Sequence, residues 1–285
     1  MQSMNSASRL SRRALLACAA SAALPLRAAK SKLKLGVTDW NLHLGGKLEA
    51  VELAKKLGFA GVEISLGRTP VDDKLRLANA AIQDDYLAAL RQNGIAAAGV
   101  CLDILHVNYL KSDKLGQKWV AASIPIAKRL NAGVVLLPFF GRGSLNTEDE
   151  RMFVADFLKE VAPEAARAGV TLGLENMCSA EQNARILDRA GSRAVKVYYD
   201  VGNSTMAGWD ILKEIPWLGA SRICQFHLKD NPSYLGEGKI QFPAVMNTIM
   251  NLGFEGFANL ETDPPSNSVE ADMKRNLDYV QRLIG

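Results

Sequence analysis

Four residues with metal-ligating side chains stand at the ends of four short apolar runs in the second half of the chain. They are Glu175, Asp200, His227 and Glu261. The gaps between them are 25, 27 and 34 residues, which is about the length of one strand and one helix each. Three carboxylates and one imidazole suit a hard-to-borderline divalent cation, so we expect one bound ion, with manganese first and magnesium, cobalt or zinc as alternatives.

The elements that would position these side chains alternate between strand and helix along the chain. Strands are expected at 33–38, 60–65, 95–101 and 133–138, and then in the four runs that carry the ligands. Eight such units in about 250 residues predict an α/β fold, a single (β/α)8 TIM barrel over residues 30–285, whose parallel strands aim their final side chains at one rim. A doubly wound sheet is the alternative, but no Gly-x-Gly-x-x-Gly follows the first strand.

The helices are expected from amphipathic spacing and from their end signals. They are placed at 48–57, 84–93, 114–130, 147–168, 180–190, 205–214, 243–252 and 269–283. Thr147 and Glu150 are spaced as a capping box at the start of the fourth helix. Pro125 and Pro163 predict a kink or a break in the third and fourth helices, because proline removes a backbone donor.

The first 29 residues differ from the rest. They hold four arginines, no acidic residue and an apolar run from Ala14 to Leu26, and Arg12-Arg13 with Leu15-Leu16 matches a twin-arginine export signal. The apolar run is too short for a stable membrane span. We therefore expect residues 1–29 to be a signal peptide and the mature protein to be periplasmic.

The charge of the chain changes when this leader is set aside. The whole chain has 34 basic and 30 acidic residues, and the leader accounts for four of the basic ones. Residues 30–285 therefore balance to zero, and no basic surface for nucleic acid is expected. The expected partner is a small sugar substrate, and a homo-oligomer is left open.

The strand-end motifs resemble the xylose isomerase-like TIM barrel superfamily, and within it the sugar phosphate isomerase/epimerase group related to endonuclease IV. The matching pieces are Leu174-Glu175-Asn176, Tyr199-Asp200-Val201-Gly202-Asn203, Phe226-His227-Leu228-Lys229-Asp230, 235–240 and Leu260-Glu261-Thr262, with Gly61-Val62-Glu63 on the second strand. The resemblance covers most of the chain after the leader. It implies that Glu175, Asp200, His227 and Glu261 bind one cation, and that Glu175 and Glu261 also carry the proton as catalytic acid and base.

The chemistry follows from this arrangement. A cation that chelates a carbonyl and the neighbouring hydroxyl acidifies the proton on the carbon between them. One carboxylate removes that proton and a second, on the other face, returns one. The residues expected to bind the substrate are Trp40, Glu63, His106, Asn203 and Lys229. For Glu63, orienting a neighbouring side chain is the alternative role.

Two positions depart from the pattern of the superfamily. Many relatives have histidine where this chain has Asn203, and an acid where it has Gln241. Asparagine hydrogen-bonds a sugar hydroxyl but does not shuttle protons near neutral pH. Both differences leave the substrate open.

The function expected is a divalent-metal-dependent sugar isomerase or epimerase acting on a free sugar or sugar derivative. One alternative is a lyase or hydrolase that uses the same groups to release the aglycone of a 3-keto-glycoside. A non-catalytic sugar-binding protein is the alternative from another class. An endonuclease is disfavoured, because its cluster of three metals needs several histidines and this chain has three in total.

Overall fold

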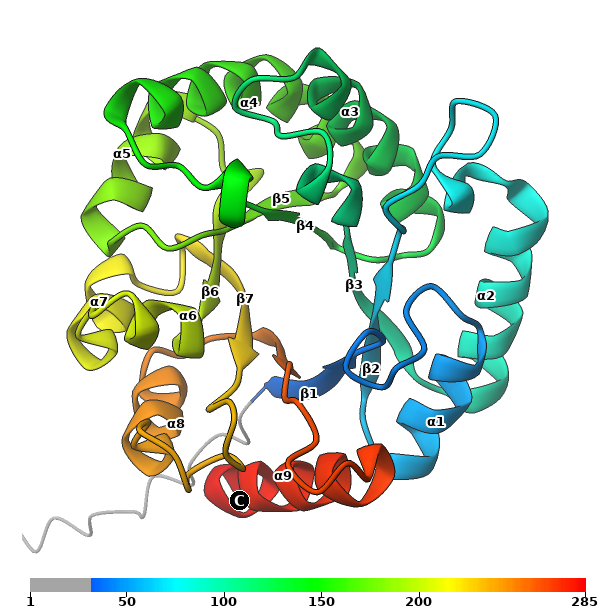
Figure 1. The fold of residues 1–285 in the computed structure, drawn as a ribbon, viewed down its shortest axis with the longest axis vertical. Coiled ribbons are helices and arrows are strands. Elements are labelled where there is room, and N and C mark those ends of the chain that lie inside the picture. The colour runs from blue at the N-terminus through cyan, green and yellow to red at the C-terminus, as the bar shows by residue number, and fades with distance from the viewer. Residues whose placement is uncertain (1–31) are drawn as a thin grey trace, which may run out of the picture. The chain divides into compact units, whose positions relative to one another are not determined.

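Eight parallel strands form a closed barrel in the structure, a computed structural model that describes residues 32–285. The expected signal peptide lies outside the described residues. The strands are β1 Leu33–Thr38, β2 Gly61–Ser65, β3 Ala96–Cys101, β4 Val134–Pro138, β5 Thr171–Glu175, β6 Val195–Asp200, β7 Ile223–Leu228 and β8 Gly256–Leu260. Each strand pairs with its neighbours in the sequence, and β1 pairs with β8 to close the ring (Figure 1). The predicted TIM barrel is confirmed.

Helices follow the strands and surround the barrel (Figure 1). They are α1 Glu49–Leu57, α2 Ala80–Asn93, α3 Lys114–Arg129, α4 Glu148–Ala168, α5 Ala180–Ala190, α6 Val201–Met206, α7 Ile211–Leu218, α8 Phe242–Asn251 and α9 Val269–Ile284. The capping box at Thr147 and Glu150 is present at the start of α4. In residues 32–285 no helix is both long and apolar enough to cross a bilayer.

The observed helices differ from the expected ones in two ways. Neither proline splits its helix, since α3 continues through Pro125 and α4 through Pro163, with buried apolar residues on both sides of each proline. The single helix expected at 205–214 is instead two helices, α6 and α7. Gly208 lies between them at φ 88°, a left-handed conformation that ends α6 soon after it begins.

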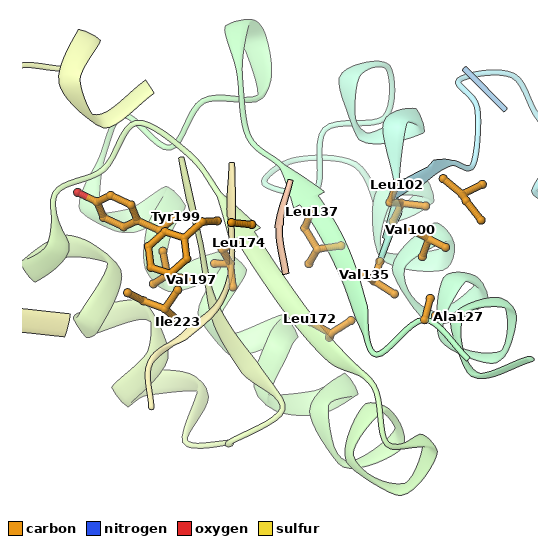
Figure 2. Packing of buried hydrophobic residues seen from close by; sticks show 14 of the residues in the cluster. Val100, Leu102, Ala127, Val135, Leu137, Leu172, Leu174, Val197, Tyr199 and Ile223 are labelled. Atoms are coloured by element: carbon orange, nitrogen blue, oxygen red, sulfur yellow. The ribbon is translucent and has the colours of Figure 1, made fainter. Parts of the chain in front are cut away.

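The main apolar core lies between the barrel and the helices. Alternate strand residues point outward into it, such as Val135 and Leu137 of β4 and Leu172 and Leu174 of β5 (Figure 2). The residues between them face the barrel axis, because successive side chains on a strand point to opposite faces. On β5, β6 and β7 this alternation places Glu175, Asp200 and His227 on the inside.

The inside of the barrel is unusually polar at the level of Glu63. Tyr198, Gln225 and Asn259 are all buried there and form a connected hydrogen-bond network with it. Gly36 makes room for this network, because a Cβ atom on Gly36 would lie 2.0 Å from Oδ1 of Asn259. These polar groups form a floor on which the residues at the carboxyl ends of the strands rest.

Candidate metal centre and sugar pocket

Glu175, Asp200, His227 and Glu261 converge at the carboxyl ends of β5, β6, β7 and β8. Each offers one ligand atom, and these atoms all lie within 4.8 Å of one another. Glu175, Asp200 and His227 are 3%, 2% and 0% exposed. The grouping expected from four strand ends is therefore present in space.

Asp200 has two distinct roles at the end of β6. Its Oδ1 accepts a hydrogen bond from the backbone N–H of Asn203 at 2.8 Å and so caps α6. Its Oδ2 is buried and accepts no hydrogen bond within residues 32–285, although Nζ of Lys229 lies 2.8 Å away. The helix cap thus fixes one oxygen and leaves the other directed at the cluster.

His227 is oriented by a carboxylate behind it. Its Nε2–H donates a hydrogen bond to Oε2 of Glu63 at 2.8 Å, and its Nδ1 faces Glu175 and Glu261 at 3.1 and 3.3 Å. Metal-ligating histidines typically donate their other N–H to such a carboxylate, which fixes the tautomer. Nδ1 is therefore directed at the same point as the carboxylates, where a bound cation would displace its proton.

The electrostatics of the cluster are those of a site that attracts cations. Burial raises the pKa of Glu175 and of Asp200, and the charges of His227 and Lys229 offset only part of this effect. Burial alone would lower the pKa of His227, but the carboxylates of Glu261, Glu175 and Glu63 outweigh it and hold the pKa well above its ordinary value. A buried group of carboxylates with one imidazole has the donor set for one divalent cation, so these residues fit the expected metal.

A cavity of about 360 Å³ opens above these side chains. It is called the inner cavity below. Its walls include Trp40, His106, Asn203 and Lys229, four of the five residues expected to contact substrate. Glu63, the fifth, is fully buried and contacts His227 instead of the cavity.

Residues of the cavity wall hold the two glutamates, Glu175 at the end of β5 and Glu261 after β8. Nε1 of Trp40 donates to Oε1 of Glu261 at 3.1 Å, and Nζ of Lys229 lies 2.5 Å from its Oε2. Nδ2 of Asn203 donates to Oε1 of Glu175 at 3.2 Å. Both carboxylates therefore reach the cavity in fixed orientations.

An aromatic and polar rim completes the inner cavity. His106 stacks on Phe140 with ring centroids 6.4 Å apart, and burial and the charge of Arg68 lower the pKa of His106. His43, which follows β1 as Trp40 does, is exposed and is not among the residues that line the cavity. Arg68 does line it but was missed, although it follows β2 by three residues and the strand-end rule that found the other residues would have found it.

Known protein sequences that resemble this chain match most of its length. The profile of a family described as xylose isomerase-like TIM barrel matches residues 51–283. The L-ribulose-5-phosphate 3-epimerase UlaE of Escherichia coli strain SMS-3-5 is 28% identical over 249 residues, covering 79% of this chain and 85% of its own.

Solved structures share the fold. A D-psicose 3-epimerase from Clostridium cellulolyticum H10, determined with D-tagatose, superposes with a TM-score of 0.74 at 16% identity, over 88% of this chain and 99% of the other. The 3-keto-D-glucoside 4-epimerase YcjR of E. coli gives a TM-score of 0.68 at 17% identity, over 88% and 99% of the two chains. At this level of identity the likeness establishes the barrel, and the chemistry must be argued from the site.

Proposed function

The chain belongs to the xylose isomerase-like TIM barrel family, and from this premise we propose that it is a divalent-metal-dependent sugar epimerase or isomerase that moves a proton on the carbon beside a carbonyl. The observation that carries the proposal is the convergence of Glu175 and Glu261 with Asp200 and His227 at the base of one cavity. Binding alone would need only the cavity. Two carboxylates at a cation site supply an acid and a base as well.

The four clustered side chains would hold the cation, which when bound would polarise the substrate carbonyl and stabilise the negative charge that develops there. Glu175 and Glu261 approach the substrate carbon from β5 and from the end of β8. One removes the proton and the other returns it, and the roles exchange when the reaction runs backwards. If the proton returns to the opposite face of the same carbon, the product is an epimer. If it returns to the former carbonyl carbon, and the neighbouring hydroxyl loses its proton to become the new carbonyl, the product is an isomer.

The surrounding residues position these groups. Trp40 and Lys229 hold Glu261, and Asn203 holds Glu175, so that neither carboxylate needs to reorganise during the reaction. His106 and Phe140 form an aromatic surface for the apolar face of a sugar ring. Asn203 keeps one oxygen to accept a hydrogen bond from a sugar hydroxyl.

We propose an unphosphorylated sugar or sugar derivative as substrate. The proposal draws support from the expected export of the protein. Of the two cationic wall residues, Lys229 is committed to Asp200 and Glu261, which leaves Arg68 at the exposed rim. A phosphate group favours several free N–H donors around it. The relatives include enzymes named for phosphorylated as well as free sugars, so both belong in the substrate panel.

The test is solvent-deuterium exchange. Purified protein loaded with Mn²⁺ is incubated in D₂O with ketohexoses, ketopentoses, their phosphates and 3-keto-glycosides, and NMR locates any carbon that gains deuterium. Deuterium at one carbon with the skeleton retained supports the proposal, whereas a released aglycone identifies the lyase.

Matched variants complete the design. Glu175→Gln and Glu261→Gln should each slow exchange by about 10² to 10⁴-fold, the usual contribution of a general acid or base. Glu255→Gln is the control, because Glu255 is exposed and pairs with Lys32 on the surface. Protein that binds the cation but exchanges no proton of any sugar would overturn the proposal in favour of a binding protein.

A further inference from the structure

A second cavity adjoins the inner one and is the larger of the two. It has a volume of about 490 Å³, against about 360 Å³ for the inner cavity, and Asn203 and Lys229 line both. It lies between α6 and the loop 229–241 that joins β7 to α8. This outer cavity has no role in the proton transfer described above.

The loop that walls the outer cavity is held in place by its own residues. The carboxylate of Asp230 accepts hydrogen bonds from the backbone N–H groups of Gly238, Lys239 and Ile240 at 3.1, 2.9 and 3.2 Å. A Cβ atom on Gly238 would lie 2.3 Å from Oδ1 of Asp230, so this close approach requires glycine. The wall is therefore built before any ligand binds, which reduces the entropy lost on binding.

A second tie anchors the start of the same loop. Nδ2 of Asn231 donates to Oδ2 of Asp263 at 2.9 Å, and the backbone N–H of Asp263 donates to Oδ1 of Asn231 at 3.1 Å. This reciprocal pair joins the loop to the chain just beyond Glu261. The outer cavity is thus fixed relative to the catalytic carboxylate.

The outer cavity has a mixed polar and apolar lining that carries little net charge. The charge of Lys229 is matched by Asp200 and Glu261, and that of Asp230 by three backbone donors. Lys239 remains as an exposed cation, and Ser233 contributes a hydroxyl. A single exposed cation supplies few of the donors that a phosphate dianion takes, and the hydroxyl of Ser233 can exchange hydrogen bonds with sugar hydroxyls.

An apolar surface lies among these polar groups. Met206 is 72% exposed and lines the outer cavity. A sugar ring presents hydroxyls at its edge and C–H groups on its face, so it complements a wall of this mixed kind. The lining of the outer cavity is therefore complementary to a second sugar ring.

We propose that the outer cavity binds the second sugar unit of the substrate, so that the substrate is an oxidised disaccharide or similar keto-glycoside whose reacting ring occupies the inner cavity. The inference deepens the proposed function and depends on it for the reacting ring. The glycosidic link then passes between Asn203 and Lys229, the two residues common to both cavities.

The experiment compares a large substituent in the outer cavity with one at the opposite end of the barrel. Ser233→Trp fills the outer cavity, and Thr205→Trp does so from α6 on its other wall. Ser221→Trp is the control, because Ser221 is exposed in the loop before β7 at the amino end of the barrel. Each protein is assayed by deuterium exchange for kcat/KM on a 3-keto-disaccharide and on a ketohexose.

Wild-type protein should prefer the keto-disaccharide by about tenfold or more, because the second ring supplies binding energy away from the reacting carbon. Ser233→Trp and Thr205→Trp should each reduce this preference about tenfold, and Ser221→Trp should leave it unchanged. Equal kcat/KM on both substrates in the wild type, unaltered by either cavity-filling variant, would overturn the inference and leave the proposed function intact. A preference for a sugar phosphate that is lost in Lys239→Ala would also overturn it.

A binding measurement separates failure of the inference from failure of the proposed function. Calorimetry with unoxidised maltose, cellobiose and trehalose against glucose needs no turnover. Tighter binding of one disaccharide, lost in Ser233→Trp, supports the outer site even where no proton exchanges. Equal binding of glucose and all three disaccharides in the wild type counts against it.

Discussion

Replacing Glu63 with glutamine tests how the barrel interior tunes the metal centre. Oε2 of Glu63 faces Nε2 of His227 at 2.8 Å, the hydroxyl of Tyr198 at 2.8 Å and Nδ2 of Asn259 at 3.2 Å. The amide oxygen of glutamine can replace Oε2 as the acceptor of all three bonds. The variant therefore removes the negative charge behind His227 and changes the shape of the site very little.

The expected magnitude comes from that lost charge. Partners behind metal-ligating histidines typically contribute about 10 to 100-fold in metal affinity, which is roughly 1.4 to 2.8 kcal/mol. The effect should fall in the upper part of this range, because both carboxyl and imidazole are fully buried and solvent does not screen them. The second oxygen, Oε1, has no hydrogen-bond partner within the described chain, and an amide NH₂ in its place adds a cost to folding.

The assay is competitive titration of Mn²⁺ against a fluorescent chelator, with circular dichroism and thermal unfolding of the metal-free proteins to separate affinity from folding. Tyr198→Phe is the matched control, since it removes one donor to Glu63 and keeps the charge. We expect a loss of affinity of about 10 to 100-fold in Glu63→Gln and under about threefold in Tyr198→Phe. Folded Glu63→Gln with the affinity of the wild type would refute the reasoning that a charged carboxylate orients His227.

Three further predictions follow from other parts of the structure. Gly36→Ala should lower the free energy of unfolding by about 1 to 3 kcal/mol in urea titrations, because its Cβ meets Oδ1 of Asn259, and an unchanged midpoint would contradict this. Burial raises the pKa of Asp39 well above its ordinary value, so folding favours its protonated form. The free energy of unfolding, compared with that of Asp39→Asn, should be highest at low pH and should decline as the pH rises through the raised pKa. A difference in unfolding free energy that stays constant from pH 4 to 9 would count against this. Replacing Arg12 and Arg13 with lysine should leave the precursor unprocessed in the cytoplasm, whereas the wild-type precursor should lose its leader. Intact mass of the protein from fractionated cells measures this. Equal processing of both proteins would argue against a twin-arginine signal.

The barrel and the grouping of the four strand-end side chains could be predicted because both follow from local periodicity. Alternating strand residues and helix-length gaps place Glu175, Asp200 and His227 at equivalent positions of successive units. The closed ring then brings equivalent positions together. No pairwise contact had to be known in advance.

The floor of the site could not be predicted in the same way. It consists of Glu63, Tyr198 and Asn259, which come from β2, β6 and β8. Their side chains meet only because they point into the barrel at the same height along its axis. Glu63 was expected from its place on a strand tip to orient a neighbour or to touch substrate, and its side chain contacts His227 from below. Strand position gives the direction of a side chain and leaves its depth along the barrel undetermined.

The helix boundaries after β6 illustrate a different limit. The side chain of Asp200 caps α6 at once, and Gly208 ends the helix within two turns, so the chain forms two short helices. The hydrophobic pattern of 205–214 was consistent with one helix. The cap at Asp200 makes α6 begin at Val201. This cap depends on the contact of Oδ1 of Asp200 with the backbone N–H of Asn203, which the hydrophobic pattern does not reveal.

The most direct measurement is anomalous diffraction from a crystal soaked in Mn²⁺, with elemental analysis of the same preparation. We predict one ion per chain in contact with Glu175, Asp200, His227 and Glu261, and its loss in Asp200→Asn. An ion bound elsewhere, or a fully folded protein that holds no divalent cation at millimolar Mn²⁺, would contradict the central claim.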